Sequence, residues 1–299
     1  MIYDIRHVTT YSYEAPVAYS LCALRLRPTS RAGQRVLDVQ VDIDPPAARR
    51  IQRVCFFGNS FEIVTIESEH RELTVSATAR IAVSRPVSPL ATPDWEEVRQ
   101  LAFSVHDLGP QSPAHFIYAS RIVTLDEATV AYARKSFPPG RQILAGAIDL
   151  MERIWDDFDY DPKATLVSTP LAEAFAKRRG VCQDFAHIMI SGLRGIGLPA
   201  RYVSGYLRTV PPAGKERLEG ADATHAWVAV WCGPLDGWVG LDPTNKMLVG
   251  DDHIILAEGR DYADISPIDG VILGSGGQDV DVGVDVIPVL SEDAPPTFG

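Results

Sequence analysis

The chain has 299 residues, of which 46% are hydrophobic and 22% are charged, so it can bury one large core or two moderate ones. Its net charge is −11, and its Lys and Arg residues form no cluster of the kind that binds phosphates, so we expect no nucleic acid partner. It contains no apolar stretch of about 18 residues, the length of a bilayer span, so we also expect no membrane partner.

Residues 1–85 have the pattern of short β-strands. Apolar or β-branched residues alternate with polar ones in segments such as 4–13, 34–43 and 71–83, and turn residues separate these segments. Several strands at this spacing predict an antiparallel β-sandwich. The stretch 84–95 contains three prolines and is typical of a linker.

The apolar spacing then becomes helical, most clearly in residues 141–158. Thr169 and Pro170 predict the N-cap and first residue of another helix, which Gly180 is expected to stop. The next helix should begin at Cys182 or just before it. Strand patterns follow at 200–208, 225–231, 237–242, 253–262 and 279–289.

Helices followed by antiparallel strands indicate an α+β fold, with helices packed on an antiparallel sheet. We divide the chain into an N-terminal β-sandwich domain (1–85), a linker with the helical part of the core (86–160), a catalytic core (161–290) and a disordered tail (291–299). The polar loop 210–224, which precedes His225, is expected to border the substrate cleft.

The four cysteines lie far apart and form no CxxC pair, which argues against a zinc site or a disulfide scaffold and favours a reducing cytoplasm. Cys182 stands out because it falls at a predicted helix start. A thiol attacks carbonyl groups as thiolate, and the N-terminus of a helix favours an anion. The alternative is a buried structural cysteine, and position alone does not decide between them.

A nucleophilic cysteine needs a base and a group to orient that base. His225 opens an alternating strand, and Asp242 ends the next strand, directly before Pro243. Alone, a strand histidine is usually packed, and Asp-Pro-Thr is a common turn. Together with Cys182 they suggest a Cys–His–Asp arrangement, provided that pleat register puts His225 and Asp242 on one face of the sheet.

The motifs around these residues are GVCQDFAH (180–187), THAWV (224–228) and GWVGLDPTN (237–245). In this order they resemble the transglutaminase-like superfamily, specifically its bacterial branch of candidate cysteine proteases. Segments 7–28 and 56–67 resemble the N-terminal domain of that branch, and 257–276 its C-terminal segment. The resemblance implies a papain-like, transglutaminase-like α+β core behind the N-terminal sandwich.

The resemblance further implies that Cys182 is the nucleophile, His225 the general base and acid, and Asp242 the orienting carboxylate. The activity it implies is a thiol hydrolase that cuts peptide or isopeptide-like amides through a thioester. Acyl transfer to an amine and an inactive binding protein on the same fold remain alternatives. We expect a peptide or protein substrate, no cofactor and no metal; the oligomeric state is left open.

Three further residues are candidates for substrate binding: Gln183, Trp227 and Trp238. For the tryptophans, burial in the core is the competing interpretation, as strand tryptophans are more often core residues. Asp184, in the first turn of the Cys182 helix, is expected to cap that helix. The chain departs from the family pattern at Ala229, where relatives often have an acidic residue.

Overall fold

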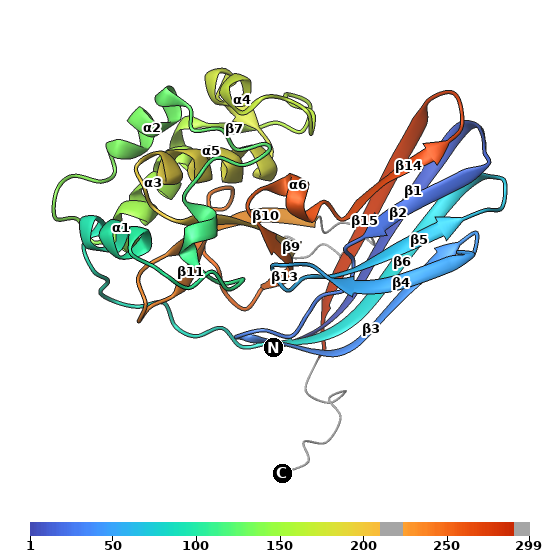
Figure 1. Ribbon diagram of the computed structural model, residues 1–299, viewed down its shortest axis with the longest axis horizontal. Coiled ribbons are helices and arrows are strands. Elements are labelled where there is room, and N and C mark those ends of the chain that lie inside the picture. Colours follow the sequence, from blue (N-terminus) through green and yellow to red (C-terminus); the bar gives the residue numbers. More distant parts are fainter. Residues whose placement is uncertain (210–223, 290–299) are drawn as a thin grey trace, which may run out of the picture.

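The computed structural model describes residues 1–209 and 224–289. The chain folds into a β-sandwich and a helix–sheet core that lie side by side (Figure 1). One buried apolar cluster lies within the core, and a second fills the sandwich and includes Tyr206, Ile254 and Leu256 of the core. The predicted disordered tail, and the predicted cleft-bordering loop apart from its last residue, Thr224, fall outside the described residues.

The sandwich consists of two four-stranded antiparallel sheets, with strand orders β15-β1-β6-β3 and β14-β2-β5-β4. Its strands are β1 (Ile2–Val17), β2 (Tyr19–Leu24), β3 (Gln34–Asp44), β4 (Arg49–Val54), β5 (Ser60–Ile66), β6 (His70–Val83), β14 (Ile268–Leu273) and β15 (Gln278–Pro288). Side chains alternate between buried and partly exposed along β5, as one core-facing sheet face requires. Apolar residues from both sheets join in one cluster, so the sheets pack face to face.

The predicted catalytic core, residues 161–290, ends too late, because its last two strands belong to the sandwich. β14 pairs with β2, and β15 pairs with β1 along eleven residues from Tyr3 to Tyr13. The chain therefore returns from the core to complete both sheets of the N-terminal sandwich (Figure 1). Strand pairing joins segments far apart in sequence, and alternation alone does not reveal which sheet a strand enters.

The core contains seven helical segments within the described residues: α1 (Trp95–Phe103), the 3₁₀ turn η1 (Pro113–Phe116), α2 (Glu127–Arg134), α3 (Ile143–Asp157), α4 (Leu171–Lys177), α5 (Cys182–Gly195) and α6 (Tyr262–Ile265). None of the helices in the described parts of the chain is both long and apolar enough to cross a bilayer. A short parallel pair joins β7 (Asp159–Tyr160) to β8 (Arg179–Gly180).

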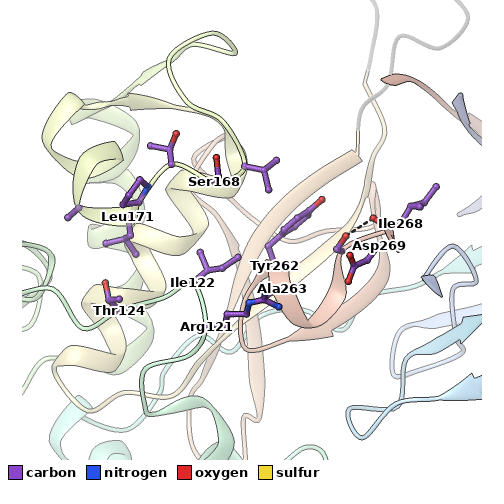
Figure 2. A pocket seen from close by; sticks show the side chains of 14 residues that line it. Arg121, Ile122, Thr124, Ser168, Leu171, Tyr262, Ala263, Ile268 and Asp269 are labelled. Atoms are coloured by element: carbon purple, nitrogen blue, oxygen red, sulfur yellow. Dashed lines mark hydrogen bonds between the residues drawn. The ribbon is translucent and has the colours of Figure 1, made fainter. Parts of the chain in front are cut away.

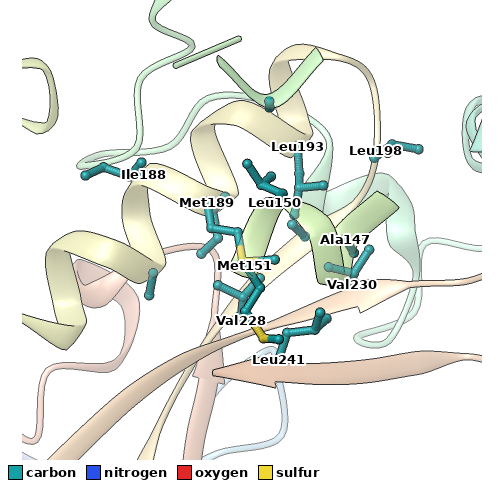
Figure 3. Packing of buried hydrophobic residues seen from close by; sticks show 14 of the residues in the cluster. Ala147, Leu150, Met151, Ile188, Met189, Leu193, Leu198, Val228, Val230 and Leu241 are labelled. Carbon is teal, nitrogen blue, oxygen red and sulfur yellow. The ribbon is translucent and has the colours of Figure 1, made fainter. Parts of the chain in front are cut away.

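The core sheet is antiparallel, with strand order β12-β11-β10-β9-β13. Its strands are β9 (Ala200–Leu207), β10 (Thr224–Trp231), β11 (Trp238–Asp242), β12 (Met247–Leu248) and β13 (His253–Gly259). Helices α3 and α5 pack on one face, where Met151, Met189 and Leu193 share a buried cluster with Val228 and Leu241 of the sheet (Figure 3). This confirms the predicted α+β architecture.

Two side-chain amides of the sandwich form hydrogen bonds with the backbone of β13, the edge strand of the core sheet. Gln34 donates to the carbonyl of Ile255 (2.7 Å) and accepts from its N–H (2.8 Å). Asn59 makes the same pair of bonds to Glu258, at 2.7 and 2.9 Å. Edge strands expose unpaired backbone groups, and here the sandwich satisfies them, so it braces the core.

Candidate active site

Cys182 is the first residue of α5, and the helix start is built around Asp184. The Asp184 carboxylate accepts the backbone N–H of Val181 (2.9 Å) and the hydroxyl of Thr165 (2.6 Å). A carboxylate in the first helical turn satisfies a free N–H group and interacts favourably with the helix dipole. Asp184 therefore caps the helix, as predicted, and fixes the turn that carries the Cys182 thiol.

Gly180 has a different role from the predicted helix stop. Helix α4 already ends at Lys177, its C-cap residue Arg178 adopts the left-handed conformation (φ 54°), and Gly180 lies in the short strand β8. A Cβ atom on Gly180 would come within 2.5 Å of Asp184 Oδ2. The glycine is thus required for the close approach of the capping carboxylate rather than for a special backbone angle.

His225 and Asp242 meet the register condition set by the sequence. In the β10–β11 hairpin Val228 pairs with Leu241, so Asp242 lies opposite Trp227, two residues from His225 and on the same face. His225 Nε2 lies 2.7 Å from Asp242 Oδ2. The six residues between the paired Trp231 and Trp238 preserve this parity.

Asp242 is fully buried and accepts hydrogen bonds on both oxygens. Oδ1 accepts the backbone N–H groups of Thr244 (2.9 Å) and Asn245 (3.1 Å). Oδ2 accepts from His225, from the Asn245 side chain (2.8 Å) and from His253 Nε2 (3.2 Å). Sequence reasoning missed both Asn245 and His253; the Asx-turn spacing of Asp242 and Asn245 could have revealed the first.

The effect of these hydrogen bonds on the pKa of Asp242 is larger than the opposite effect of its burial. Burial raises the pKa of Asp242, but hydrogen bonds from His225, His253 and Asn245 hold it well below its usual range. The group is therefore an anion at neutral pH and a strong acceptor for the imidazole.

The thiol of Cys182 reaches the same imidazole. Burial lowers the pKa of His225, but hydrogen bonds to Asp242 and Cys182 and the charges of both raise it to about 10. Because Asp242 occupies Nε2, Nδ1 is the nitrogen left for the thiol. The structure thus brings the three predicted residues together around one imidazole.

Of the three predicted substrate-binding residues, Trp227 and Trp238 line one cavity, and Gln183 is not part of its lining. Gln183 follows Cys182 in the first turn of α5 and is half-buried. Trp227 is 1% exposed and its ring lies next to that of His225, with centroids 6.0 Å apart. Its ring crosses β9 above Gly205, where a Cβ would come within 2.6 Å of it. Trp238 packs against the guanidinium of Arg201, 4.4 Å from its ring centroid.

At Ala229, where relatives often have an acidic residue, the neighbouring arginine finds its carboxylate on another strand. Ala229 lies directly across from Arg201 in the β9–β10 pair, so an acidic residue there would face this arginine. In this chain Glu258 of β13 supplies the carboxylate, 2.9 Å from Arg201 and 2.8 Å from Arg31. These residues line a cavity of about 810 Å³ with Trp227 and Ala229, on the sheet face opposite α5.

A second cavity, of about 680 Å³, opens between the core and the sandwich. Figure 2 shows Ser168 and Leu171 on one side, Ile268 and Asp269 on the other, and Tyr262 between them. Tyr262 packs edge-to-face on Tyr202, whose phenol pKa is raised well above its usual value by burial and by Cys182. The backbone N–H of Tyr262 donates to His187 Nε2 of α5 (3.3 Å), so the cavity lies beside that helix.

His187, also on α5, does not join the site. It is buried, accepts the backbone N–H of Tyr262 through Nε2 (3.3 Å) and packs at a tilt against the ring of Tyr202. Burial lowers its pKa to about 4, so the ring is neutral and serves as a hydrogen-bonded core residue.

Known proteins share both parts of this architecture. Residues 3–82 match the family described as the bacterial transglutaminase-like N-terminal region, and residues 131–243 match the transglutaminase-like superfamily. An uncharacterized protein of Mycobacterium bovis is 38% identical over 296 residues, which cover 96% of this chain and 92% of the relative. One from Mycobacterium leprae is 32% identical over 283 residues, covering 94% and 96%. The chain belongs to the transglutaminase-like superfamily.

Two further proteins are similar to this chain. A crystal structure from Cytophaga hutchinsonii, described as a candidate cysteine protease, superposes with a TM-score of 0.75 at 20% identity, over 100% of this chain and 94% of that one. It therefore shares the fold. A Pseudomonas aeruginosa protein named protein-glutamine gamma-glutamyltransferase is 35% identical over 115 residues, 36% of this chain and 17% of that protein.

Proposed function

We propose that the chain is a cysteine hydrolase that cleaves peptide or isopeptide-like amide bonds through a Cys182–His225–Asp242 triad. The observation that carries this proposal is the position of one imidazole, bonded to the buried Asp242 at 2.7 Å and in contact with a thiol at a helix start. An imidazolium held in this way favours the thiolate, which is the nucleophilic form of cysteine.

The residues define the steps of the reaction. The Cys182 thiolate attacks the amide carbon, and the oxygen becomes an oxyanion. The backbone N–H of Cys182, free at the first position of α5, is a donor available to this oxygen. His225 then gives its proton to the leaving amine, a thioester remains, and water activated by His225 releases the acid. Asp242 keeps the imidazole aligned throughout.

Acyl transfer to an amine is the second candidate function. It shares the thioester and differs only in whether water or an amine attacks it. The similarity to the Pseudomonas glutamyltransferase over 115 residues favours keeping this alternative. A glutamine peptide incubated with and without a primary amine separates the two, because both reactions release ammonia but differ in product. Incorporation of the amine into the peptide marks transfer, and free acid marks hydrolysis.

The proposal is tested by labelling with iodoacetamide and mapping the site by mass spectrometry. Cys182 should label ahead of Cys22 and Cys232, whose thiol pKa values are raised by burial, and ahead of the half-buried Cys55. In His225→Ala the Cys182 rate should fall sharply. If Cys182 reacts no faster than Cys55 and is unaffected by His225→Ala, the chain is a binding protein on this fold instead. The four unpaired cysteines suit the cytoplasm, which we include in the proposal.

A further inference from the structure

We propose that His253 is a positioning residue of this site, a neutral second imidazole that holds Asp242 in the orientation His225 needs. This inference rests on the proposed function, because it assigns a role within the same triad. The residue lies at the start of β13, the far edge of the core sheet from β11, which carries Asp242. Two imidazoles from different strands thus converge on one carboxylate oxygen.

The hydrogen bonds of His253 fix which nitrogen carries the proton. Its Nδ1 accepts the backbone N–H of Gly250 (3.3 Å), and an amide N–H can only donate. The ring is therefore unprotonated at Nδ1 and carries its hydrogen on Nε2. That hydrogen points to Asp242 Oδ2 at 3.2 Å, so His253 is a neutral donor to the carboxylate.

The position of the ring is fixed on all sides. His253 is 1% exposed, and its ring stands edge-to-face on Trp227, with centroids 5.3 Å apart and planes at 76°. Trp227 in turn lies against His225, and the two histidine rings are 6.4 Å apart. The backbone carbonyl of His253 accepts from the guanidinium of Arg85, at the start of the linker. Packing thus leaves the donor little freedom to turn away.

The two carboxylates that precede His253 in the sequence, Asp251 and Asp252, bond to groups other than its ring. Asp251 accepts the backbone N–H of Arg85 (2.7 Å), and Asp252 pairs with Arg208 at 3.2 Å. Asp242 is therefore the carboxylate that the His253 ring bonds, and His225 is the titratable group that shares it.

The hydrogen bond from His253 helps to set the orientation of the Asp242 carboxylate. Without His253, Oδ2 keeps its bonds to His225 and to Asn245, but Asn245 sits in the same turn and moves with the carboxylate. His253 ties Oδ2 to a different strand. A hydrogen bond to a charged group is worth about ten- to a hundredfold in an equilibrium, so its loss should measurably weaken the imidazolium that supports the thiolate.

The experiment measures the rate of Cys182 alkylation by iodoacetamide against pH. In wild type the rate should already be high below neutral pH, because the imidazolium supports the thiolate. In His253→Leu, which keeps the packing volume but lacks the N–H, the acidic midpoint of the profile should move to higher pH, with a rate at pH 6 about tenfold lower. His253→Gln, which retains a neutral N–H donor, should restore most of the rate.

A double-mutant cycle separates positioning from a general structural role. If His253 acts through Asp242, His253→Leu should have little further effect on the profile of Asp242→Asn. Additive effects, or a His253→Leu profile equal to wild type, would overturn the inference. Should His253→Leu fail to fold, the comparison of His253→Gln with the shorter His253→Asn decides in its place: equal profiles contradict the proposal. If wild-type Cys182 shows no enhanced reactivity, the proposed function itself fails, which is a distinct result.

Discussion

Gly180 and Asp184 fit together only because Gly180 has no side chain: a Cβ there would lie 2.5 Å from the carboxylate oxygen and 2.9 Å from Asp184 Cβ. The same carboxylate caps the helix that begins with Cys182. Packing at Gly180 is therefore linked directly to the position of the nucleophile.

Gly180→Ala should lower both activity and stability. The added methyl group displaces Asp184 from the Val181 N–H, so we expect a loss of about 1–3 kcal/mol in the free energy of unfolding. Activity should fall by about a hundredfold because the Cys182 thiol shifts relative to His225. Denaturant unfolding and turnover measure the two effects. Gly109→Ala is the matched control, since the atoms nearest to a Cβ at that position belong to the exposed side chain of Asp107, at 3.1 Å or more.

Asp242→Asn should lower the pKa of His225 from its value of about 10. The negative charge and the hydrogen bond of Asp242 both raise that pKa, and burial, which lowers it, remains in the variant. The ring should consequently lose its proton at lower pH, and turnover should drop by about a hundredfold or more. NMR titration of the His225 ring measures the shift. Asp156→Asn, at an exposed surface pair, should leave the titration unchanged; a His225 titration that is the same in Asp242→Asn would contradict this account.

The central residues of the site could be predicted because each has a local signature. Cys182 follows a helix break, and His225 and Asp242 sit at the ends of two strands whose hairpin has the right parity. His253 could not be predicted in this way. It reaches Asp242 from β13, a strand that does not pair with β11, and no local spacing encodes such a contact.

In the fold, too, local patterns predict some elements and long-range contacts determine others. The long alternating strands and the helix at Ile143–Asp157 follow from hydrophobic periodicity. Strand β4 (Arg49–Val54) was missed because it lies at a sheet edge and is mostly exposed, so its residues show no apolar alternation. The return of β14 and β15 to the sandwich is set by long-range pairing, which a pattern within one segment does not contain.

Glu258→Gln should be strongly destabilising. Its carboxylate is 7% exposed and balances the guanidinium groups of both Arg31 and Arg201. Removing the charge leaves the buried Arg201 and the partly buried Arg31 without their shared anion, at a cost of about 3–5 kcal/mol. Urea unfolding measures the change. Glu173→Gln tests the contrast, because its pair with Lys177 is about half exposed and should be worth less than about 1 kcal/mol; equal effects would show that Glu258 is not a buried counter-ion.

Gln34→Leu and Asn59→Ala should each weaken the union of sandwich and core. Each substitution leaves the N–H and carbonyl of one β13 residue, Ile255 or Glu258, buried without a partner, and we expect a loss of about 2–4 kcal/mol in unfolding free energy. Gln40→Leu is the control, because that amide is exposed and bonds Asp42 of the same strand. Hydrogen exchange of the Ile255 and Glu258 amides locates the effect: faster exchange in the two seam variants, and not in the control, is the expected result. Unchanged protection at β13 would mean that the sandwich merely sits beside the core and does not complete its sheet.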